Sequence, residues 1–533
     1  MTAGGGSIIG GEISRNKQSP QCGVALIEAA DRLGGSRRER RRALWYNPYA
    51  LHESALRKTD DDAVIAMENK DIFMARRIAE AVRNAGGHTY FVGGFVRDAL
   101  LGRENKDIDI EVHEIPVAAL EAILDGLGER LTMGASFGVM GLRHYDLDIA
   151  MPRSEVATGR GHKDFAVFVD PYLGAEKAAR RRDFTMNALM QDVLTGEVLD
   201  FFGGREDLKR KRIRHVDDLT FAEDPLRVFR AAQFAARFGF TVAAETSALS
   251  NRMDVAALAG ERVMGELEKA LLKAEKPSVF FEELKKMRQL SIWFPELEAL
   301  SGIPQSPVHH PEGDVWTHTM QVLDEAAALR EKASEPLWFM LAALCHDFGK
   351  AAATEEINGA LHAYGHEKLG IPLAERFLGR ITTEVKLTKY VLNMTELHMQ
   401  PNKKAREASR EKSFMTMFDQ SVCPEDLLLL AKADHMGRVG PGVRREPMAE
   451  EYAETENKLR EMLTVYKDRM GQPYIMGRDL LAAGMQPGPL ISEALSYAHK
   501  LRLAGIPKEE QLTQTLGYMR KAQQKSNYSK RLN

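Results

Sequence analysis

The 533-residue sequence lacks the features of several common protein classes. It has only three cysteines, Cys22, Cys345 and Cys423, which are scattered and form no CxxC pair. This argues against a disulfide framework and predicts a cytoplasmic protein in a reducing compartment. The best apolar run, at 336–345, is about half of the roughly 20 residues that a membrane-spanning helix needs. We therefore expect no membrane partner.

The sequence also lacks a strong charge of either sign, since its formal net charge is −3. Any contact with nucleic acid must come from local basic patches. Apolar residues make up 44% of the chain and charged residues 28%, as in ordinary globular proteins. The length is too great for one core, so we expect three or four domains. Nothing in the sequence indicates an oligomeric state.

Hydrophobic patterning divides the chain into regions. Residues 1–66 have no sustained period and many breakers, which predicts a flexible extension and a folded part that starts near Met67. Short strands then alternate with helices. From about residue 176 the pattern turns helical and mostly stays so, which predicts a small α/β head on a long helical body.

The stretch "GGFVRDALLGRENKDIDIEV", residues 93–112, contains the first candidate site. Residues two apart on a strand point the same way, roughly 7 Å apart, so Asp107 and Asp109 would share one face. Paired carboxylates suit Mg²⁺, and two such ions can clamp the reacting oxygens of a phosphoryl transfer. Asp148, in "DLDIA", is a candidate third acid.

The beginning of the same stretch suggests phosphate binding. Gly93 and Gly94 allow backbone N–H groups to approach a phosphate, and Arg97, one helical turn later, can pair with it. A glycine pair or a DxD alone is more often a turn or a solvent-facing strand edge. The order strand, glycine pair, helix, acidic strand and later acid favours a catalytic site.

This stretch resembles the signature of nucleotidyltransferases of the DNA polymerase β superfamily, in particular the bacterial CCA-adding tRNA nucleotidyltransferases and poly(A) polymerases. The family's further motifs follow in order, over roughly residues 70–300: "RRDFTMNAL" at 181–189, "EDPLRVFRAAQFAARFGF" at 223–240 and "ERVMGELEKALL" at 261–272. The resemblance implies that Asp107 and Asp109 hold Mg²⁺ and that Asp148 assists in activating the attacking hydroxyl.

The second motif predicts a helix start with Asp183 in the capping region. The resemblance places Arg181 or Arg182 near the incoming triphosphate. A loop at 157–165, "ATGRGHKDF", looks like the element that relatives need to switch from C to A addition, and so favours full CCA addition.

The third motif predicts a helix with Asp224 as N-cap and Pro225 at its first position. Asp224, Arg227 and Arg230 would share one side of it. The resemblance implies that Asp224 and Arg227 select C and A through their exocyclic amines and ring acceptors, and that Arg230 contacts phosphate or base. Gln233 departs from the family, where many relatives have an arginine.

A second constellation lies further along the chain. Its members are His318, His346, Asp347, His366, His398 and Asp434. A lone histidine is more often a surface or core group, but this mixed N/O set suits a divalent metal whose identity the sequence leaves open. We expect His318, His346, Asp347 and Asp434 to hold one ion, and His366 and His398 could hold a second. The set resembles the HD phosphohydrolase superfamily over about residues 308–440.

The predicted fold class is α+β: a small polymerase-β-like α/β nucleotidyltransferase head, then an all-α neck and body and an all-α HD domain. The predicted parts are 1–66 (extension), 67–200 (head), 201–307 (neck and body), 308–440 (HD domain) and 441–533 (helical tail region). The predicted function is addition or repair of the CCA end at the tRNA acceptor with CTP and ATP, with a second, HD phosphatase or phosphodiesterase activity.

Three alternatives stay open at this point. The first is a poly(A) polymerase or an enzyme that adds only CC or only A. The second is an HD nucleotide phosphohydrolase with a non-catalytic head. The third is a catalytically silent tRNA-binding protein, against which the complete set of acids counts.

Overall fold

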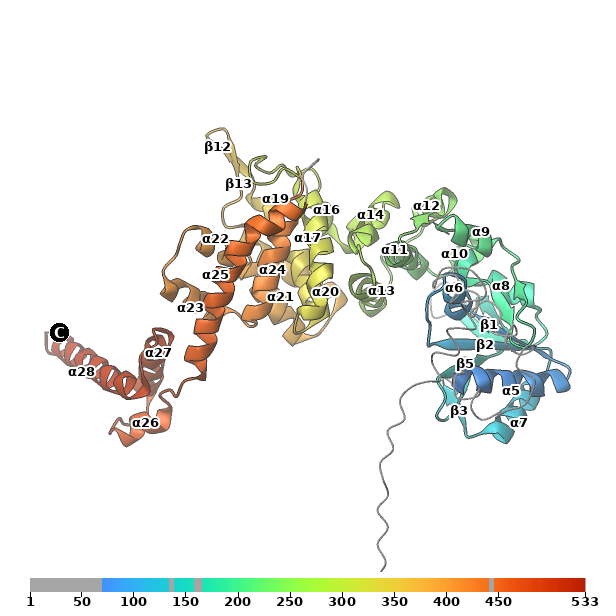
Figure 1. Ribbon diagram of the computed structural model, residues 1–533, viewed down its shortest axis with the longest axis horizontal. Helices are drawn as coiled ribbons and strands as arrows, with labels where there is room; N and C mark the ends of the chain where they lie inside the picture. Colours follow the sequence, from blue (N-terminus) through green and yellow to red (C-terminus); the bar gives the residue numbers. More distant parts are fainter. Residues whose placement is uncertain (1–69, 134–138, 158–164, 441–444, 533) are drawn as a thin grey trace, which may run out of the picture. The chain divides into compact units, whose positions relative to one another are not determined.

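The computed structural model (Figure 1) describes residues 70–133, 139–157, 165–440 and 445–532. These residues form two compact units. The first runs to Ala179 and includes Asn187–Phe201, and the second consists of Arg180–Met186 and the chain from Phe202 onward. The predicted extension, 1–66, lies outside the described residues. In the part of the chain that is described, no helix is long and apolar enough to cross a membrane.

The first unit contains the elements of the predicted head. They are α5 (Lys70–Asn84), β1 (His88–Val92), α6 (Gly94–Leu100), β2 (Ile108–His113), α7 (Val117–Leu127), β3 (Arg130–Met133), β4 (Val139–Leu142), β5 (Leu147–Ala150), β6 (Arg153–Ala157), β7 (Phe165–Val169), α8 (Ala175–Arg180), β8 (Met190–Asp192) and β9 (Val198–Leu199).

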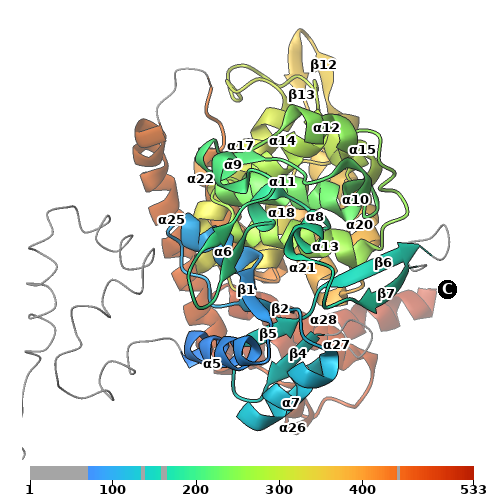
Figure 2. The ribbon, with the colours of Figure 1, turned by 90° about the vertical axis from the view of Figure 1, so that its right-hand side faces the viewer.

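A seven-stranded sheet in the order β3-β4-β5-β2-β1-β8-β9 organises this unit. The β2–β5 pair is parallel and its neighbouring pairs are antiparallel. Helices α5 and α7 lie side by side against the sheet (Figure 2), and α6 packs on β1 and β2. At the start of β2 the side chains alternate as expected for a strand: Ile108 and Ile110 are buried, and Asp109 between them is partly exposed.

The prediction of a helical chain from about residue 176 misses two strands of this sheet. Strands β8 and β9 come after α8, and β8 pairs with β1. They are three and two residues long. Such short strands show no alternation that a sequence pattern can register.

The second unit begins with a helical neck. Its elements are the 3₁₀ turn η2 (Thr185–Asn187), whose last residue belongs to the first unit, and α9 (Gly204–Lys209), β10 (Arg212–Ile213), α10 (Asp218–Ala222), α11 (Leu226–Phe238), β11 (Thr241–Val242), α12 (Ala244–Ser250), α13 (Gly260–Lys273), α14 (Ser278–Lys286), α15 (Leu290–Trp293) and α16 (Pro295–Glu298). Helix α11 packs on α13 and α14. Phe229, Phe280 and Phe294 form an aromatic cluster there, with ring centroids 6.2–6.4 Å apart.

The next helices form a bundle. They are α17 (Val315–Leu329), the 3₁₀ turn η3 (Arg330–Lys332), α18 (Pro336–Cys345), α19 (Lys350–Ala353), α20 (His366–Ile381), α21 (Val385–Leu397), α22 (Gln400–Arg406), α23 (Glu411–Gln420) and α24 (Pro424–Met436), with the hairpin β12 (Glu355–Ile357) and β13 (Ala360–His362) before α20. The longest apolar run of the sequence is α18. It is buried from Phe339 to Cys345 and contacts α17, α21 and α24, so it is the central helix of the bundle.

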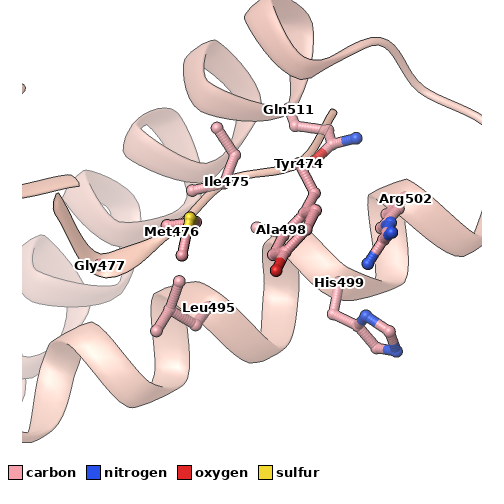
Figure 3. Close-up of a pocket in the computed structure, with 9 residues that line it drawn as sticks. All are labelled: Tyr474, Ile475, Met476, Gly477, Leu495, Ala498, His499, Arg502 and Gln511. Carbon is pink, nitrogen blue, oxygen red and sulfur yellow. The ribbon is translucent and has the colours of Figure 1, made fainter. Parts of the chain in front are cut away.

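The chain ends in four helices, α25 (Arg445–Gly471), α26 (Gly477–Ala482), α27 (Pro489–Leu503) and α28 (Lys508–Leu532). Helix α25 packs against α22, α23 and α24. A cavity of about 340 Å³ lies beside the segment that joins α25 to α26 (Figure 3), and Tyr474 and Arg502 stand at its wall, with the guanidinium 4.1 Å from the ring centroid.

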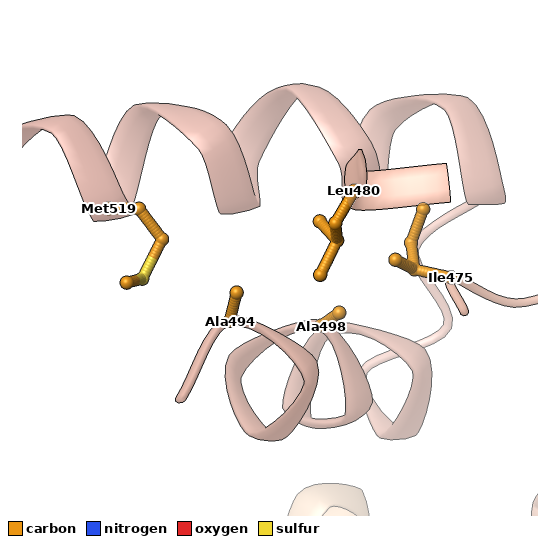
Figure 4. Packing of buried hydrophobic residues seen from close by; sticks show 5 residues of the cluster. All are labelled: Ile475, Leu480, Ala494, Ala498 and Met519. Carbon is orange, nitrogen blue, oxygen red and sulfur yellow. The ribbon is translucent and has the colours of Figure 1, made fainter. Parts of the chain in front are cut away.

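A small apolar core holds these last helices together. Ile475, Leu480, Ala494, Ala498 and Met519 meet between α26, α27 and α28 (Figure 4). Within residues 473–495 the structure places α26, a turn and the start of α27.

Candidate active site and metal centre

The glycine pair lies at the junction of β1 and α6. Gly93 has φ +66° and ψ −131°, a backbone conformation that only glycine adopts without strain. Arg97 lies behind this turn and is buried. Its Nε and Nη2 donate to the Asp98 carboxylate at 2.8 and 2.9 Å, and its Nη1 donates to Asn187 Oδ1 at 2.7 Å. Arg97 thus braces the turn from inside, and its predicted contact with a phosphate stays a prediction.

The predicted acids lie on two adjacent strands. Asp107 directly precedes β2 and is exposed, and Asp109 lies two residues on, which places both on one face. Asp148 of β5 is the register partner of Asp109 in the parallel pair. The structure therefore brings Asp109 and Asp148 side by side.

The turn and the acidic strand are linked by one asparagine. Asn105 Nδ2 donates to Asp98 Oδ2 at 2.9 Å, and Asn105 Oδ1 accepts from the backbone N–H of Asp107 at 3.0 Å. Since Asp98 also holds Arg97, a short chain of hydrogen bonds fixes the start of β2 relative to the glycine pair. Sequence reasoning missed Asp98, Asn105 and Asn187: the first two lie inside the quoted stretch but have no distinctive spacing, and Asn187 is 90 residues from Arg97.

The predicted helix at 181–189 is absent. In its place is a single 3₁₀ turn, η2. The backbone hydrogen bonds of this segment go to a distant strand-like segment, because Thr185 N–H donates to Arg214 O at 2.9 Å and Val216 N–H donates to Asp183 O at 3.3 Å. Asp183 does act locally, since its carboxylate accepts from Phe184 N–H at 2.8 Å.

Helix α11 begins at Leu226, one residue later than predicted, and Pro225 precedes it. The Asp224 carboxylate still accepts from Leu226 N–H at 3.1 Å. That carboxylate also pairs with Arg262 Nη2 of α13 at 2.9 Å, a contact that sequence reasoning missed. Arg262 belongs to the quoted motif "ERVMGELEKALL", but only the packing of α13 on α11 shows its partner.

The two predicted site arginines of α11, Arg227 and Arg230, have different partners. Arg227 Nη2 donates to the backbone oxygen of Arg181 at 2.9 Å, and Arg230 pairs with Asp183 at 2.6 Å. Burial alone would lower the pKa of Arg230, but the carboxylates of Asp183 and Glu266 raise it, so this side chain stays charged. Gln233, the departure from the family pattern, is only 1% exposed and is a core group of α11.

The second constellation converges from five places in the bundle. His318 comes from α17, His346 and Asp347 follow α18, His366 begins α20, His398 follows α21, and Asp434 lies on α24. All six are buried, none more than 4% exposed. The nitrogens and oxygens of His318, His346 and Asp434 lie within 4.8 Å of one another, and so do those of Asp347, His366 and His398.

Backbone carbonyls fix three of the imidazoles. In His346, His366 and His398 the Nδ1 lies 2.7 Å from the carbonyl oxygen three residues earlier. Each Nδ1–H therefore donates to the backbone three residues earlier and leaves Nε2 as the ligand atom, a common device for orienting metal-binding histidines. The Nε2 atoms of His366 and His398 are 3.3 Å apart.

Asp347 lies between the two groups. Its Oδ2 is 3.1 Å from His346 Nε2 and 3.5 Å from His318 Nε2, while its Oδ1 is 3.3 Å from His366 Nε2 and 3.7 Å from His398 Nε2. The sequence assigned Asp347 to the first ion alone. The geometry suits a carboxylate that bridges two ions.

The donor set fits a divalent metal. His346 Nε2 and both Asp347 carboxylate oxygens are buried, and the Asp347 oxygens face Lys350 Nζ and the imidazole nitrogens of the other candidate ligands at 2.8–3.7 Å. Burial alone would raise the pKa of Asp347, but His346 and Lys350 hold it well below its usual range. Burial and the neighbouring imidazoles lower the pKa of His398 to about 3. An ionised carboxylate and a neutral imidazole are the states that bind metal.

Three charged residues around these ligands were missed. The Glu312 Oε1 lies 2.8 Å from His318 Nδ1 and 2.8 Å from His310 Nδ1. Lys350 Nζ is 2.8 Å from Asp347 Oδ2, and Arg438 Nη2 is 2.8 Å from Asp434 Oδ2. None of the three stands out locally, although Lys350 follows Asp347 by three residues.

Gly349 and Gly370 allow the chain after Asp347 to pack closely against α20. A Cβ on Gly349 would lie 2.0 Å from the backbone oxygen of His366 and 2.6 Å from the backbone nitrogen of Gly370. The chain after Asp347 can therefore lie directly against the first turns of α20 only without a side chain at position 349. This contact sets the spacing between Asp347 and His366.

A cavity of about 280 Å³ opens onto the metal centre. The residues that line it include Asp347, His366 and Asp434, and the cations Lys350, Arg406 and Arg438. The larger cavity near α26 has His499 and Arg502 in its wall, but no carboxylate among the described residues that line it. Of these two cavities, the one of about 280 Å³ is lined by candidate metal ligands.

Two family models match separate parts of the chain, one in the head and one in the helical bundle. Residues 89–214 match the family of the poly A polymerase head domain, and residues 315–436 match the HD domain family. The fold and these matches define the class of the chain: a nucleotidyltransferase head joined to an HD domain.

Curated relatives narrow the class to one family. The chain is 35% identical over 376 residues to the multifunctional CCA protein of Actinobacillus pleuropneumoniae serotype 5b, across 68% of this chain and 88% of that protein. It is 39% identical over 367 residues to that of Pasteurella multocida, across 66% and 84%. The multifunctional CCA protein of Halorhodospira halophila is 34% identical over 433 residues, across 79% and 97%. The chain belongs to the family of multifunctional CCA proteins.

Solved structures share the fold. The Thermotoga maritima CCA-adding enzyme, in a complex with tRNA, has a TM-score of 0.57 at 19% identity and covers 86% of this chain and 99% of its own. The Bacillus stearothermophilus CCA-adding enzyme, in a complex with CTP, has a TM-score of 0.57 at 20% identity and covers 85% and 99%. At these identities the likeness concerns the fold.

Proposed function

We propose that the chain adds or repairs the 3′-terminal CCA of tRNA with CTP and ATP. The observation that carries this proposal is the pairing of Asp109 with Asp148 on parallel strands, one hydrogen-bonded chain away from the Gly93–Gly94 turn. Membership in the family of multifunctional CCA proteins supports it. The 3′-hydroxyl of tRNA forms the new bond to the α-phosphorus, and the bond to pyrophosphate breaks.

We assign the residues of the head as follows. Asp107 and Asp109 would hold Mg²⁺, which when bound neutralises charge on the phosphates. The backbone of Gly93 and Gly94 would hold the triphosphate, with Arg181 or Arg182, and Asp148 would take the proton of the attacking hydroxyl.

Nucleotide choice would belong to α11. Asp224 can accept from the exocyclic amine of C or A, and Arg227 can donate to a ring acceptor. The contact of Asp224 with Arg262 keeps that carboxylate oriented. The loop at 157–165 that favours full CCA addition lies, for residues 158–164, outside the described part of the chain.

We further propose that the HD centre hydrolyses phosphate esters on nucleotides, in the same reducing cytoplasm that the cysteine content predicts. The mixed histidine and carboxylate ligands favour a transition metal over Mg²⁺. A metal bound there activates water for attack on phosphorus. Lys350 and Arg438, which stand beside the ligands at the cavity wall, would steady the phosphate.

One assay separates the proposed activity from its rivals. The protein is incubated with tRNA that ends before CCA, before CA or before A, with labelled CTP and ATP. Addition of the missing nucleotides followed by arrest supports CCA addition. Continued incorporation of A would instead identify a poly(A) polymerase, addition of only C or only A would identify a partial enzyme, and no incorporation would leave only the HD activity or a binding role.

A further inference from the structure

A short hairpin leads the chain into the metal centre. Strands β12 and β13 are joined by Asn358 and Gly359, whose φ angles of +53° and +77° are those of a tight two-residue hairpin turn. Strand β13 ends at His362, and α20 begins four residues later with the ligand His366. The segment between them is therefore held at both ends, by the hairpin and by the helix.

This segment carries two stacked rings. The rings of His362 and Tyr364 have centroids 4.8 Å apart and lie 14° from parallel. Tyr364 is 72% exposed, although it lies between two ordered elements. The residue between them, Ala363, accepts the Nδ1–H of His366 through its carbonyl oxygen at 2.7 Å. The ring pair is thus tied to the orientation of a candidate metal ligand.

Both rings line the 280 Å³ cavity that opens onto the metal centre. Asp347 and the cations that pair with the ligands, Lys350 and Arg438, line the same cavity. A single exposed tyrosine is an ordinary surface feature. An exposed, pre-stacked pair at the rim of a cationic cavity has the arrangement that proteins use to hold unpaired bases.

We propose that the His362–Tyr364 pair is a nucleobase subsite of the HD centre. The inference rests on the proposed phosphohydrolase function: the phosphate of the substrate lies at the Asp347 group, and its base stacks on the exposed ring of Tyr364. Tyr364 lies two positions before His366, so their Cα atoms are at most about 7 Å apart. One nucleotide can span this distance from its phosphate to its base. The ligand class is a mononucleotide or the terminal nucleotide of an RNA.

The stacking face predicts a graded preference between bases. Stacking tolerates any base, and its strength grows with the size of the ring system. The HD centre should therefore favour purine over pyrimidine nucleotides, and a phosphate ester without a base should gain nothing from the pair.

The test uses the full-length protein and four variants, three at Tyr364 and one control. Tyr364→Ala removes the ring, Tyr364→Phe and Tyr364→Trp keep it, and Tyr172→Ala is a matched control at a 63% exposed tyrosine of the first unit. The substrates are adenosine 2′-monophosphate, cytidine 2′-monophosphate and glycerol 2-phosphate, which has no base. For the adenosine substrate, Tyr364→Ala should raise KM about 5- to 150-fold with kcat little changed, as loss of one stacked base implies.

The same variant should lose most of the adenosine-over-cytidine preference and should hydrolyse glycerol 2-phosphate as the unsubstituted protein does. The two aromatic variants and Tyr172→Ala should keep the original KM. Equal losses on all three substrates would overturn the proposal and make Tyr364 a support for His366. Unchanged kinetics on all three would place the base elsewhere.

Binding gives a readout that needs no turnover. Isothermal titration calorimetry with adenosine 2′-monophosphate should show the same 5- to 150-fold loss of affinity in Tyr364→Ala. If the unsubstituted protein hydrolyses none of the substrates, the hydrolase assignment fails and the subsite is judged by calorimetry alone. Weaker binding by Tyr364→Ala then supports the subsite, and equal binding overturns it.

Discussion

The head and the HD domain both present carboxylates to a reaction, but they hold them in opposite ways. In the head, Asp107 and Asp148 are exposed on the edge of two strands, and only Asp109 is partly covered. In the HD domain six ligands are buried and three imidazoles are locked by backbone carbonyls. An open pair suits Mg²⁺, which keeps waters and takes further ligands from substrate phosphates, whereas a closed N/O set suits a resident metal.

The largest expected effects are losses of one activity while the other is unchanged. Asp109→Ala should lower nucleotide incorporation into tRNA at least about 10²- to 10³-fold, because it removes a ligand of the ion that neutralises the phosphates. Hydrolysis of adenosine 2′-monophosphate should be unchanged. Asp347→Asn, which keeps the shape of the bridging side chain, should have the converse effect.

Both rates are measured on each purified variant, and thermal unfolding shows whether it is folded. Loss of both activities in either single variant, in a protein that remains folded, would contradict two independent centres.

A smaller effect should follow from the support of the HD ligands. Glu312→Gln removes the charge that faces His318 Nδ1, and loss of such a supporting carboxylate typically lowers metal affinity about 10- to 100-fold. Affinity is measured by competition with a chelating dye. Glu355→Gln, at an exposed position of the hairpin β12–β13, is the control and should leave the affinity unchanged. An equal fall in both variants would show that Glu312 has no special role.

A glycine that packs against the HD ligands should affect the HD site and not the head. Gly349→Ala places a Cβ 2.0 Å from the His366 backbone oxygen, so α20 must move away from Asp347. We expect a loss of about 1–3 kcal/mol in unfolding free energy and most of the HD activity, with nucleotide incorporation retained.

Gly379→Ala, in α20, has open space around its Cβ and should stabilise the protein by about 0.5–1 kcal/mol. Thermal unfolding and both activity assays compare the two variants. A Gly349→Ala protein with normal HD activity would show that the close approach does not position His366.

The smallest effect concerns stability away from both sites. Asp324 accepts from Ser278 N–H and Oγ–H at 3.1 and 2.9 Å and so caps α14. Burial raises its pKa from 3.8 to about 6. The folded state therefore favours the protonated acid, and this contribution to stability is complete below about pH 4 and lost as the pH rises through about 6.

Asp324→Asn removes the charge and keeps an acceptor for Ser278 N–H. It should raise stability at pH 7 by about 1–2 kcal/mol and flatten the dependence between pH 4 and pH 7. Urea unfolding at several pH values measures both changes. Destabilisation that grows as the pH rises from 4 to 7 would show that the ionised form makes the better cap.

Local sequence patterns were enough to predict the secondary structure around residues 93–112. The strand, the glycine pair, α6 and β2 occur where the pattern places them, because each is defined by periodicity or a breaker within a few residues. The predicted helix at 181–189 failed, since its backbone groups bond to residues 214–216, which no local pattern reveals. The strands β8 and β9 were too short to leave a signal.

The HD ligands were predictable as a set, but their arrangement was not. The resemblance supplied six residues in order, while the position of Asp347 between the two groups of candidate ligands depends on how α18, α20 and α21 pack. Glu312 and Arg262 act through partners 6 and 38 residues away, respectively, without a shared motif. Such contacts come from tertiary packing.

Selective removal of metal tests most directly whether one chain holds two independent metal-dependent activities. The protein is treated with 1,10-phenanthroline, which binds transition metals and not Mg²⁺, then dialysed and assayed with Mg²⁺ for CCA addition and for hydrolysis of adenosine 2′-monophosphate. We predict that CCA addition persists while hydrolysis is lost and returns on adding a transition metal. Loss of both activities together, or survival of both, would contradict the assignment of separate ions to the head and the HD domain.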